Sequence, residues 1–178
     1  MDGDLPRPGL GGRPAGAGAH RFLGGEGSSL RFRRQRGELT QAIGRSRGGR
    51  TTKIHALTDD LCRPFAFLLT GGQVADCTAA DTLLEQMPAT SILHGDKGYD
   101  SDAVRRKIES KGAAPNIPPK ANRRWKNCFS PYLYRDRNAI ERMFGRLKDF
   151  RRIATRYDRL AQNFLAAVCL AATVCYWL

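Results

Sequence analysis

Acidic residues are scarce in this sequence: its 178 residues include 17 Asp and Glu but 30 Lys and Arg. The formal net charge of +13 favours a polyanionic partner, and nucleic acid is the usual one. A solvated basic surface without a partner is the alternative, because strong charge also keeps a protein soluble. The length fits one domain with a real hydrophobic core.

Paired cysteines, a histidine cluster and a membrane-length apolar run are also lacking. The five cysteines show no C-x-x-C spacing and are odd in number, which is typical of buried or free thiols in a reducing cytoplasm. The three histidines are scattered and suggest no metal cluster. The longest apolar run, 164–178, has 15 residues against the roughly 20 of a spanning helix, so it predicts a buried terminal helix. The N-terminus lacks the apolar core of a secretory signal.

Glycine, proline and arginine dominate residues 1–43, where no period of 2 or 3.6 residues is visible. We predict that 1–43 is a poorly structured segment. From Gly44 onward strand-like and helix-like patterns alternate, which predicts an α/β domain with a mixed sheet flanked by helices over 44–178. Strands are expected at 51–58, 64–70, 90–94 and 113–119, helices at 79–87, 101–111, 132–153 and 157–178, and basic loops at 44–50 and 120–131.

The stretch DKGYDSD, residues 96–102, directly follows the predicted strand that ends at His94. Asp96 thus follows the end of a strand and begins a turn, which raises the question of which other side chains lie near its carboxylate. Lys97, Tyr99, Asp100 and Asp102 are expected to be turn and helix-cap residues rather than ligands. Asp96 is therefore the candidate functional carboxylate of this stretch.

Four polar residues of the predicted helix 132–153 fall on one side of it. At about 100° per residue, they share one narrow stripe that borders the apolar, core-facing side. Glu141 can therefore look along the edge of the sheet. An exposed ladder of ion pairs would give the same stripe, because Arg137 and Glu141 are four residues apart. The four residues are Tyr134, Arg137, Glu141 and Lys148.

The spacing of this stripe resembles the signature of the DDE transposases of bacterial insertion sequences, specifically the insertion-sequence-five group. DKGYDSD is similar to the segment that carries the second catalytic aspartate of that family. GRSRGG followed by TKIHAL, and FRRIATRYD near the end of the chain, are similar to further stretches of the same group. The resemblance runs from about Gly37 to Leu178.

The resemblance implies a ribonuclease-H-like fold in which two aspartates and a glutamate hold two Mg²⁺ or Mn²⁺ ions. Asp96 and Glu141 would be catalytic residues and metal ligands. The reaction would be cleavage of DNA strands and their transfer during transposition of an insertion sequence. The partner would be double-stranded DNA, both the ends of the element and the target. The protein would act at the nucleoid in a bacterial cytoplasm, without a membrane partner, and it could form a homodimer.

By the same resemblance, other residues would contact DNA. Arg137 and Lys148 would bind phosphates, and Tyr134 would position a phosphate or the strand being cut. Around Trp125, the basic loop could grip and stack against DNA, although a loop with one packed tryptophan is nearly as good an interpretation. Its candidate DNA-binding residues are Arg123, Arg124 and Lys126.

The first aspartate that the family requires has no match ahead of GRSRGG. Asp2 and Asp4 have no strand pattern behind them, and Asp59, Asp60 and Asp76 are better explained as turn residues. We therefore expect a partial catalytic domain that lacks a proper first strand, as in a truncated or disrupted copy. The alternative function is a catalytically dead transposase remnant that at most binds DNA non-specifically.

Overall fold

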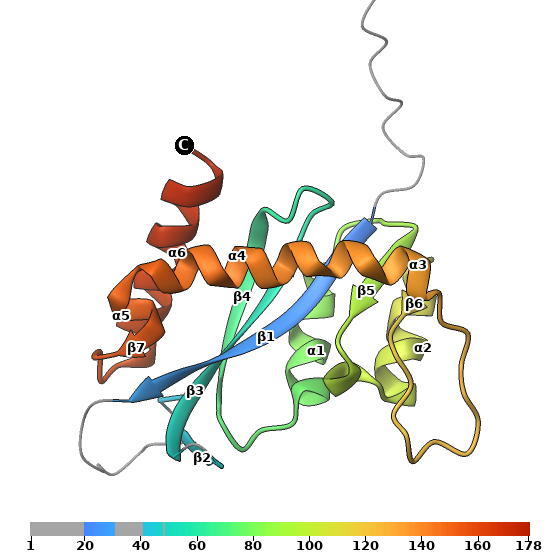
Figure 1. Cartoon of the computed structure of the whole chain (residues 1–178), viewed down its shortest axis with the longest axis horizontal. Helices are drawn as coiled ribbons and strands as arrows, with labels where there is room; N and C mark the ends of the chain where they lie inside the picture. Colours follow the sequence, from blue (N-terminus) through green and yellow to red (C-terminus); the bar gives the residue numbers. More distant parts are fainter. Residues whose placement is uncertain (1–19, 31–40, 48) are drawn as a thin grey trace, which may run out of the picture.

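The computed structural model describes residues 20–30, 41–47 and 49–178. These residues form a mixed sheet with helices on both faces (Figure 1). The strands are β1 (His20–Leu30), β2 (Gly44–Ser46), β3 (Gly49–Thr58), β4 (Pro64–Gly71), β5 (Ile92–Gly95), β6 (Ala114–Asn116) and β7 (Thr155–Arg156). The helices are α1 (Asp76–Glu85), α2 (Asp102–Ser110), α3 (Pro131–Tyr134), α4 (Asn138–Asp149), α5 (Arg151–Ala154) and α6 (Ala161–Tyr176), with 3₁₀ turns η1 (Lys97–Tyr99) and η2 (Arg135–Arg137).

Strand β1 lies in the centre of the sheet (Figure 1). Along one side it pairs antiparallel with β3, and along the other it pairs parallel with β5. The sheet continues outward through β4 and β2, which both pair with β3, and through β6, which pairs with β5. The predicted mixed sheet flanked by helices is thus confirmed.

The prediction that the fold lacks a proper first strand is wrong, and the predicted poorly structured segment contains β1 at residues 20–30. Its sequence HRFLGGEGSSL is rich in glycine and serine, which fit strands poorly by themselves. The strand forms because neighbours on both sides satisfy its backbone groups and because Phe22 and Leu23 are buried. Residues 1–19 and 31–40, which include Asp2 and Asp4, lie outside the described residues.

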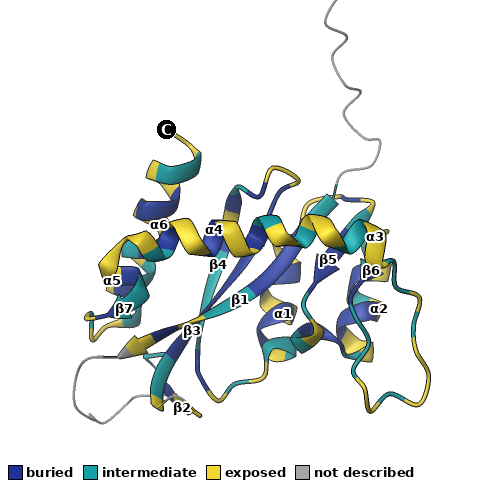
Figure 2. Ribbon diagram, in the orientation of Figure 1, coloured by how far each residue is buried: buried dark blue, intermediate teal, exposed yellow. Residues whose placement is uncertain are grey.

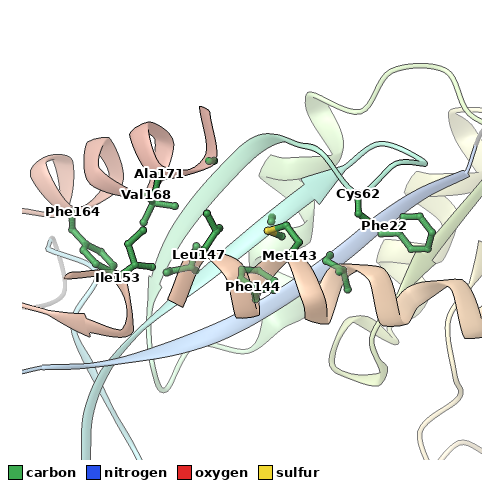
Figure 3. Packing of buried hydrophobic residues seen from close by; sticks show 13 residues of the cluster. Phe22, Cys62, Met143, Phe144, Leu147, Ile153, Phe164, Val168 and Ala171 are labelled. Carbon is green, nitrogen blue, oxygen red and sulfur yellow. The ribbon is translucent and has the colours of Figure 1, made fainter. Parts of the chain in front are cut away.

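Two hydrophobic cores lie on opposite faces of the sheet. One core packs α4 and α6 against β1 and β3, with Phe22, Ile54 and Phe144 among its members (Figure 3). The other packs α1 and α2 against the opposite face, where Leu23 and Leu57 are buried. Adjacent residues of β1 therefore serve different cores, since successive side chains of a strand point to opposite faces.

The predicted helix 132–153 is divided into shorter elements in the structure. Backbone angles stay helical at Tyr134, Arg135 and Asn138, so α3, η2 and α4 follow one direction (Figure 1). Phe150 is extended, with φ −75° and ψ 107°, and ends α4 before the short α5. The predicted loop 44–50 also differs, because it contains β2 and the start of β3.

Helix α6 corresponds to the predicted terminal helix. Phe164 and Val168 are buried on its inner face, whereas Leu170 and Val174 are exposed on the outside (Figure 2). No helix in the described ranges is long and apolar enough to cross a membrane. All five cysteines are free thiols, as their spacing predicts.

Arg156 joins the end of β7 to distant parts of the chain and is fully buried. Its guanidinium donates hydrogen bonds to the carbonyls of Asp158 (2.8 Å), Gln41 (2.9 Å) and Arg159 (3.1 Å). It also donates to the Thr52 hydroxyl on β3 at 2.7 Å. A buried cation of this kind is tolerable only because its donors are satisfied.

Replacing Arg156 by alanine should therefore destabilise the fold strongly. The Arg156→Ala variant leaves several buried acceptors without donors, so we expect the free energy of unfolding to fall by about 3 kcal/mol or more. Urea denaturation followed by circular dichroism measures this loss. The matched control is Arg152→Ala, whose side chain is 68% exposed and pairs with Asp158 at 3.0 Å; it should lose less than about 1 kcal/mol. Equal losses in the two variants would contradict the role given to Arg156.

Candidate active site

A small cavity of about 70 Å³ lies where β1, the end of β5 and α4 meet. Three carboxylate residues line it, and they come from three elements that are far apart in the sequence: Glu26 on β1, Asp96 after β5, and Glu141 on α4. The cavity has room for a few water-sized groups. Its full lining is Gly24, Gly25, Glu26, Asp96, Arg137, Ile140, Glu141 and Phe144.

Parallel pairing of β1 with β5 places Asp96 beside the middle of β1. Leu23 is the partner of Gly95 in this register, so Asp96 leaves β5 next to the Gly24–Glu26 stretch. The η1 turn then begins, and the Tyr99 amide donates a hydrogen bond to the Asp96 carbonyl at 2.9 Å. The predicted placement of Asp96 at the end of a strand is confirmed.

Two glycines on β1 let the neighbouring elements approach closely. A Cβ at Gly24 would lie 2.8 Å from Cδ1 of Ile140 on α4. A Cβ at Gly25 would lie 2.9 Å from the His55 ring on the opposite face and 3.0 Å from the Tyr99 hydroxyl. Helix α4 and the Asp96 turn can therefore both reach β1 at the level of Glu26.

The Arg137 guanidinium connects two of the carboxylates. Its Nη1 lies 2.7 Å from Oδ1 of Asp96, and its Nη2 forms an ion pair with Glu141. The guanidinium also lies over the Tyr134 ring, 5.4 Å from its centroid, and the Tyr134 hydroxyl donates to Oδ1 of Asp96 at 3.3 Å. Arg137 and Glu141 do form the expected i,i+4 pair, but the stripe also reaches Asp96 and is therefore more than an exposed ladder.

Lys148 completes the stripe at the other end of α4. Its ammonium forms an ion pair with the third carboxylate, that of Glu26. Both side chains are partly exposed, Lys148 by 33% and Glu26 by 40%. Each of the three carboxylates is thus paired with a cationic side chain of the signature stripe.

The pKa of Asp96 is raised above its usual range. Burial of the carboxyl is the main cause, and the nearby negative charges of Glu141 and Asp76 add to it. The positive charge of Arg137 and the hydrogen bond from Tyr134 oppose the shift. The partly buried carboxylate of Asp96 therefore depends on a neighbouring cation to stay charged, and Arg137 supplies one in this structure.

The carboxylates suit Mg²⁺ or Mn²⁺, which prefer hard oxygen ligands. Cationic side chains already lie against all three of them, as expected of a site that attracts positive charge. In the described part of the chain, however, no three His, Cys, Asp or Glu side chains lie close enough together to hold a metal ion. A metal site would thus need the carboxylates to move toward one another.

A buried network supports the site from the opposite face of the sheet. Nδ1 of His55 lies 2.7 Å from the Tyr99 hydroxyl, and its Nε2 lies 2.8 Å from the Thr70 hydroxyl. His55 and Tyr99 are both fully buried. Burial lowers the pKa of His55 to about 4, so its ring is neutral and bonds to hydroxyls without a buried charge. The network ties the Asp96 turn to β3 and β4.

The second buried histidine, His94, lies near the end of β5. Nε2 of His94 lies 3.0 Å from Nδ1 of His20, and its Nδ1 lies 3.1 Å from the Asn116 amide. Burial, assisted by the neighbouring His20, lowers the pKa of His94 to about 4. His94 and His55 thus join strands of the sheet, and both lie in strands that the sequence predicts.

The basic loop 120–131 is fastened to the Asp96 turn through Asp100. Arg105 lies 2.9 Å from one oxygen of this carboxylate; Arg123 (2.6 Å) and the Lys120 amide (2.7 Å) bind the other. Burial would raise the pKa of Asp100, but these hydrogen bonds outweigh it and lower the pKa. Arg123 also pairs with Asp102. Asp100 is thus a turn residue, as predicted.

The three cations of this loop, which the sequence predicts to bind DNA, lie in different surroundings. Arg123 is turned inward to Asp100, so its first role is to hold the loop. Arg124 and Lys126 are exposed, and Trp125 between them is 80% exposed. The interpretation of this tryptophan as a packed residue is wrong, because the loop presents it to solvent.

Sequence reasoning missed Glu26 because it searched for an aspartate on a recognisable strand. Glu26 lies in a glycine-rich stretch, where strand formation depends on the neighbouring strands rather than on local preference. A usable signal was present: Glu26 is the acidic residue of the small-residue segment EGSSL, shortly ahead of GRSRGG. Among the other acids, Asp59 is a turn residue that accepts hydrogen bonds from the amides of Leu61 and Arg63, whereas Asp76 begins α1 and pairs with Lys53 at 2.9 Å.

The sequence that forms this site matches a known protein family. The sequence profile of the family described as Transposase DDE domain matches residues 26–178, so the match begins at Glu26. The chain belongs to the DDE transposase family. A Brucella ovis protein described as a transposase for insertion sequence element IS6501 is 33% identical over 129 residues, which cover 72% of this chain and 98% of that protein.

A second DDE relative comes from Burkholderia cepacia and is described as a transposase for insertion sequence element IS402. It is 32% identical over 137 residues, which cover 71% of this chain but only 63% of that protein. The expected membership among the DDE transposases of bacterial insertion sequences is thus confirmed. This chain nevertheless spans less than two thirds of this relative.

Among solved structures, the synaptic complex of piggyBac transposase with hairpin DNA shares the fold of this DDE domain. The TM-score is 0.57 at 10% identity, covering 90% of this chain and 47% of that one. A likeness at this identity concerns the fold alone. With the central β1, it confirms the expected ribonuclease-H-like arrangement of a mixed sheet flanked by helices.

The buried histidines predict how stability depends on pH. Both have a pKa of about 4 in the folded chain, below the 6.5 that is usual for the side chain. Between these values the unfolded chain binds protons that the folded chain does not. The free energy of unfolding should therefore be highest, as far as these two histidines determine it, above pH 6.5. It should decrease as the pH falls toward 4, by up to about 1.4 kcal/mol per pH unit for each histidine.

Urea denaturation at pH 7 and pH 5 tests this linkage. The His94→Gln variant removes one of the two titrating rings, so it should lose about half of the pH-dependent change, whatever its stability at pH 7. A His94→Gln variant with the same pH dependence as the original chain would show that His94 is not the source of the effect.

Proposed function

We propose that this chain catalyses metal-dependent cleavage and transfer of DNA strands in transposition of an insertion sequence. One observation carries the proposal: Glu26, Asp96 and Glu141 meet at one cavity from β1, β5 and α4. Glu26 takes the part that the resemblance assigns to a first aspartate. The proposed place of action is DNA of the nucleoid in a bacterial cytoplasm.

Glu26, Asp96 and Glu141 would hold the divalent ions, which when bound supply an activated nucleophile and stabilise the leaving oxygen of a phosphodiester. The chain's own residues orient this site. The His55 and Tyr99 pair fixes the Asp96 turn, and close packing at Gly24 places Glu141 of α4 against β1. These contacts bring the backbone segments that carry the carboxylates to one cavity, so that movements of the side chains could complete the site, and such positioning contributes to rate.

DNA would be bound by two sets of side chains. Tyr134, Arg137 and Lys148 border the carboxylates and would bind the phosphates near the bond to be cut. Arg124 and Lys126 would bind the backbone further along, while Trp125 would stack on an unpaired base. The bonds from Lys120 and Arg123 to Asp100 join the loop that carries this second set to the Asp96 turn.

A catalytically dead remnant that binds DNA non-specifically is the second candidate. It is favoured by the spacing of the carboxylates, since no three acidic, cysteine or histidine side chains of the described ranges are poised for a metal. A glutamate at position 26 also has one more methylene group than the aspartate of the family pattern. Both candidates share the DNA-binding surface and differ only in cleavage.

Cleavage assays with carboxylate variants separate the two candidates. The substrate is a plasmid that carries the chromosomal segment flanking the gene, incubated with Mg²⁺ or Mn²⁺ and the 178-residue chain. We expect nicking that falls by about a hundredfold or more in Glu26→Gln, Asp96→Asn and Glu141→Gln, because each removes a ligand that orients the reacting groups. Glu26→Asp should cleave faster than the original chain.

Two results would count against the proposal. Nicking that persists in the Glu26→Gln variant would exclude Glu26 from the site. No cleavage by either the original chain or Glu26→Asp, with DNA binding retained, would favour the dead remnant. Circular dichroism of each variant checks that the fold is intact.

Salt titrations test the assignment of the basic loop. Arg124→Ala and Lys126→Ala should each lower the slope of log affinity against log salt by about one unit for a short duplex, because each removes one phosphate contact. Trp125→Ala should weaken binding of single-stranded DNA by about 1–3 kcal/mol. Fluorescence anisotropy measures both effects. Arg152→Ala, at the far end of the domain, is the control and should leave both unchanged; loop variants that behave like Arg152→Ala would remove this loop from the DNA surface.

A further inference from the structure

Arg137 and Lys148 are proposed above to bind DNA phosphates, but in this structure both side chains are paired with carboxylates of the site. Arg137 binds Asp96 and Glu141, and Lys148 binds Glu26. Only 17% of the Arg137 side chain is exposed, so little of it faces a DNA backbone. A cation that is already paired with a carboxylate also offers little net charge to a phosphate.

We propose that Arg137 and Lys148 are internal counter-cations that exchange partners. In the metal-free chain they neutralise the carboxylates of the site. A divalent metal takes their place, and the released side chains then bind DNA phosphates. This inference rests on the proposed function and adds a regulation to it: the metal switches on part of the DNA-binding surface.

Competition for the same carboxylates favours such an exchange. The cavity of about 70 Å³ is lined by three carboxylates and by Arg137, and Lys148 pairs with one of these carboxylates, that of Glu26. A divalent ion bound to Asp96 would share its Oδ1 with the Arg137 guanidinium, 2.7 Å away. Positive charges that close repel each other strongly in a partly buried site, so the guanidinium must leave when the ion binds.

The local structure lets the side chains leave without a change of backbone. Arg137 is at the junction of η2 and α4, and Lys148 is in the last turn of α4. Both have long side chains with several rotatable bonds. The Tyr134 ring, 5.4 Å from the guanidinium, offers Arg137 a face along which it can turn away from Asp96. Rotation about side-chain bonds therefore suffices for the exchange.

The exchange makes metal and DNA binding mutually favourable. A metal that frees two phosphate-binding cations raises the affinity for DNA, and by linkage DNA raises the affinity for the metal to the same extent. Exposed Arg124 makes no such contact with the three carboxylates, so its contribution to DNA binding is independent of the metal. This difference provides a matched control.

Salt titrations of DNA binding, with and without Mn²⁺, test the exchange. The probe is a short duplex without element ends, so that it is bound rather than processed. Without Mn²⁺, Arg137→Gln should leave the slope of log affinity against log salt unchanged; with Mn²⁺ it should lower the slope by about one unit. Lys148→Gln should behave in the same way. Arg124→Gln should lower the slope by about one unit under both conditions.

Mn²⁺ binding without DNA gives an independent readout, measured by electron paramagnetic resonance of free Mn²⁺. Arg137→Gln should bind Mn²⁺ about fivefold more tightly, the factor that corresponds to one competing ion pair lost. If Arg137 instead pins Asp96 in place, the variant binds Mn²⁺ more weakly. Glutamine keeps the hydrogen-bonding capacity and the helix preference of the position, and circular dichroism checks the fold.

The outcomes separate the exchange from the proposed function. Suppose that the original chain binds Mn²⁺, and that Arg137→Gln lowers the slope of log DNA affinity against log salt equally with and without Mn²⁺. This result would overturn the exchange and leave the proposed function standing. Weaker Mn²⁺ binding by Arg137→Gln would overturn it as well. No Mn²⁺ binding by the original chain, nor by Glu26→Asp, would refute the metal-dependent function itself and the exchange with it.

Discussion

The structure depends on a glycine-rich strand held between two others. Strand β1 has little preference of its own for an extended backbone, yet β3 and β5 pair along both of its sides. Its two cores lie back to back through Phe22 and Leu23. The absence of side chains at Gly24 and Gly25 lets α4 and the Asp96 turn close on the same point. The site forms because β1 lies in the centre of the sheet and has no side chains at these two positions.

Electrostatic compensation is the second organising feature. Three carboxylates on a strand, a turn and a helix would repel one another in a partly buried cavity. Arg137 at the end of η2 and Lys148 on α4 are their partners and compensate this negative charge. The same side chains carry the charge that suits a phosphate backbone. Helix α4 and the η2 turn before it therefore carry one carboxylate of the site, the counter-charges and the proposed DNA contacts.

The Asp100 carboxylate couples this site to the loop that presents Trp125. Arg105, Arg123 and the Lys120 amide all bind it, so the start of the loop is joined to the Asp96 turn. The indole of Trp125, 80% exposed, lies between two exposed cations. Under the proposed function, DNA would meet an aromatic ring and two positive charges on one loop.

The sequence by itself determined the α/β class, most of the strands and helices, the position of Asp96 at a strand end and the stripe from Tyr134 to Lys148. These features follow from periodicity and spacing among residues that are close together in the sequence. Only the tertiary structure decided that β1 is a strand, that Glu26 joins Asp96 and Glu141, and that Arg123 faces inward while Trp125 faces out. The physical reason is that these outcomes rest on long-range contacts: a glycine-rich segment becomes a strand only between two partners, and a side chain finds its ion pair only after distant elements have met.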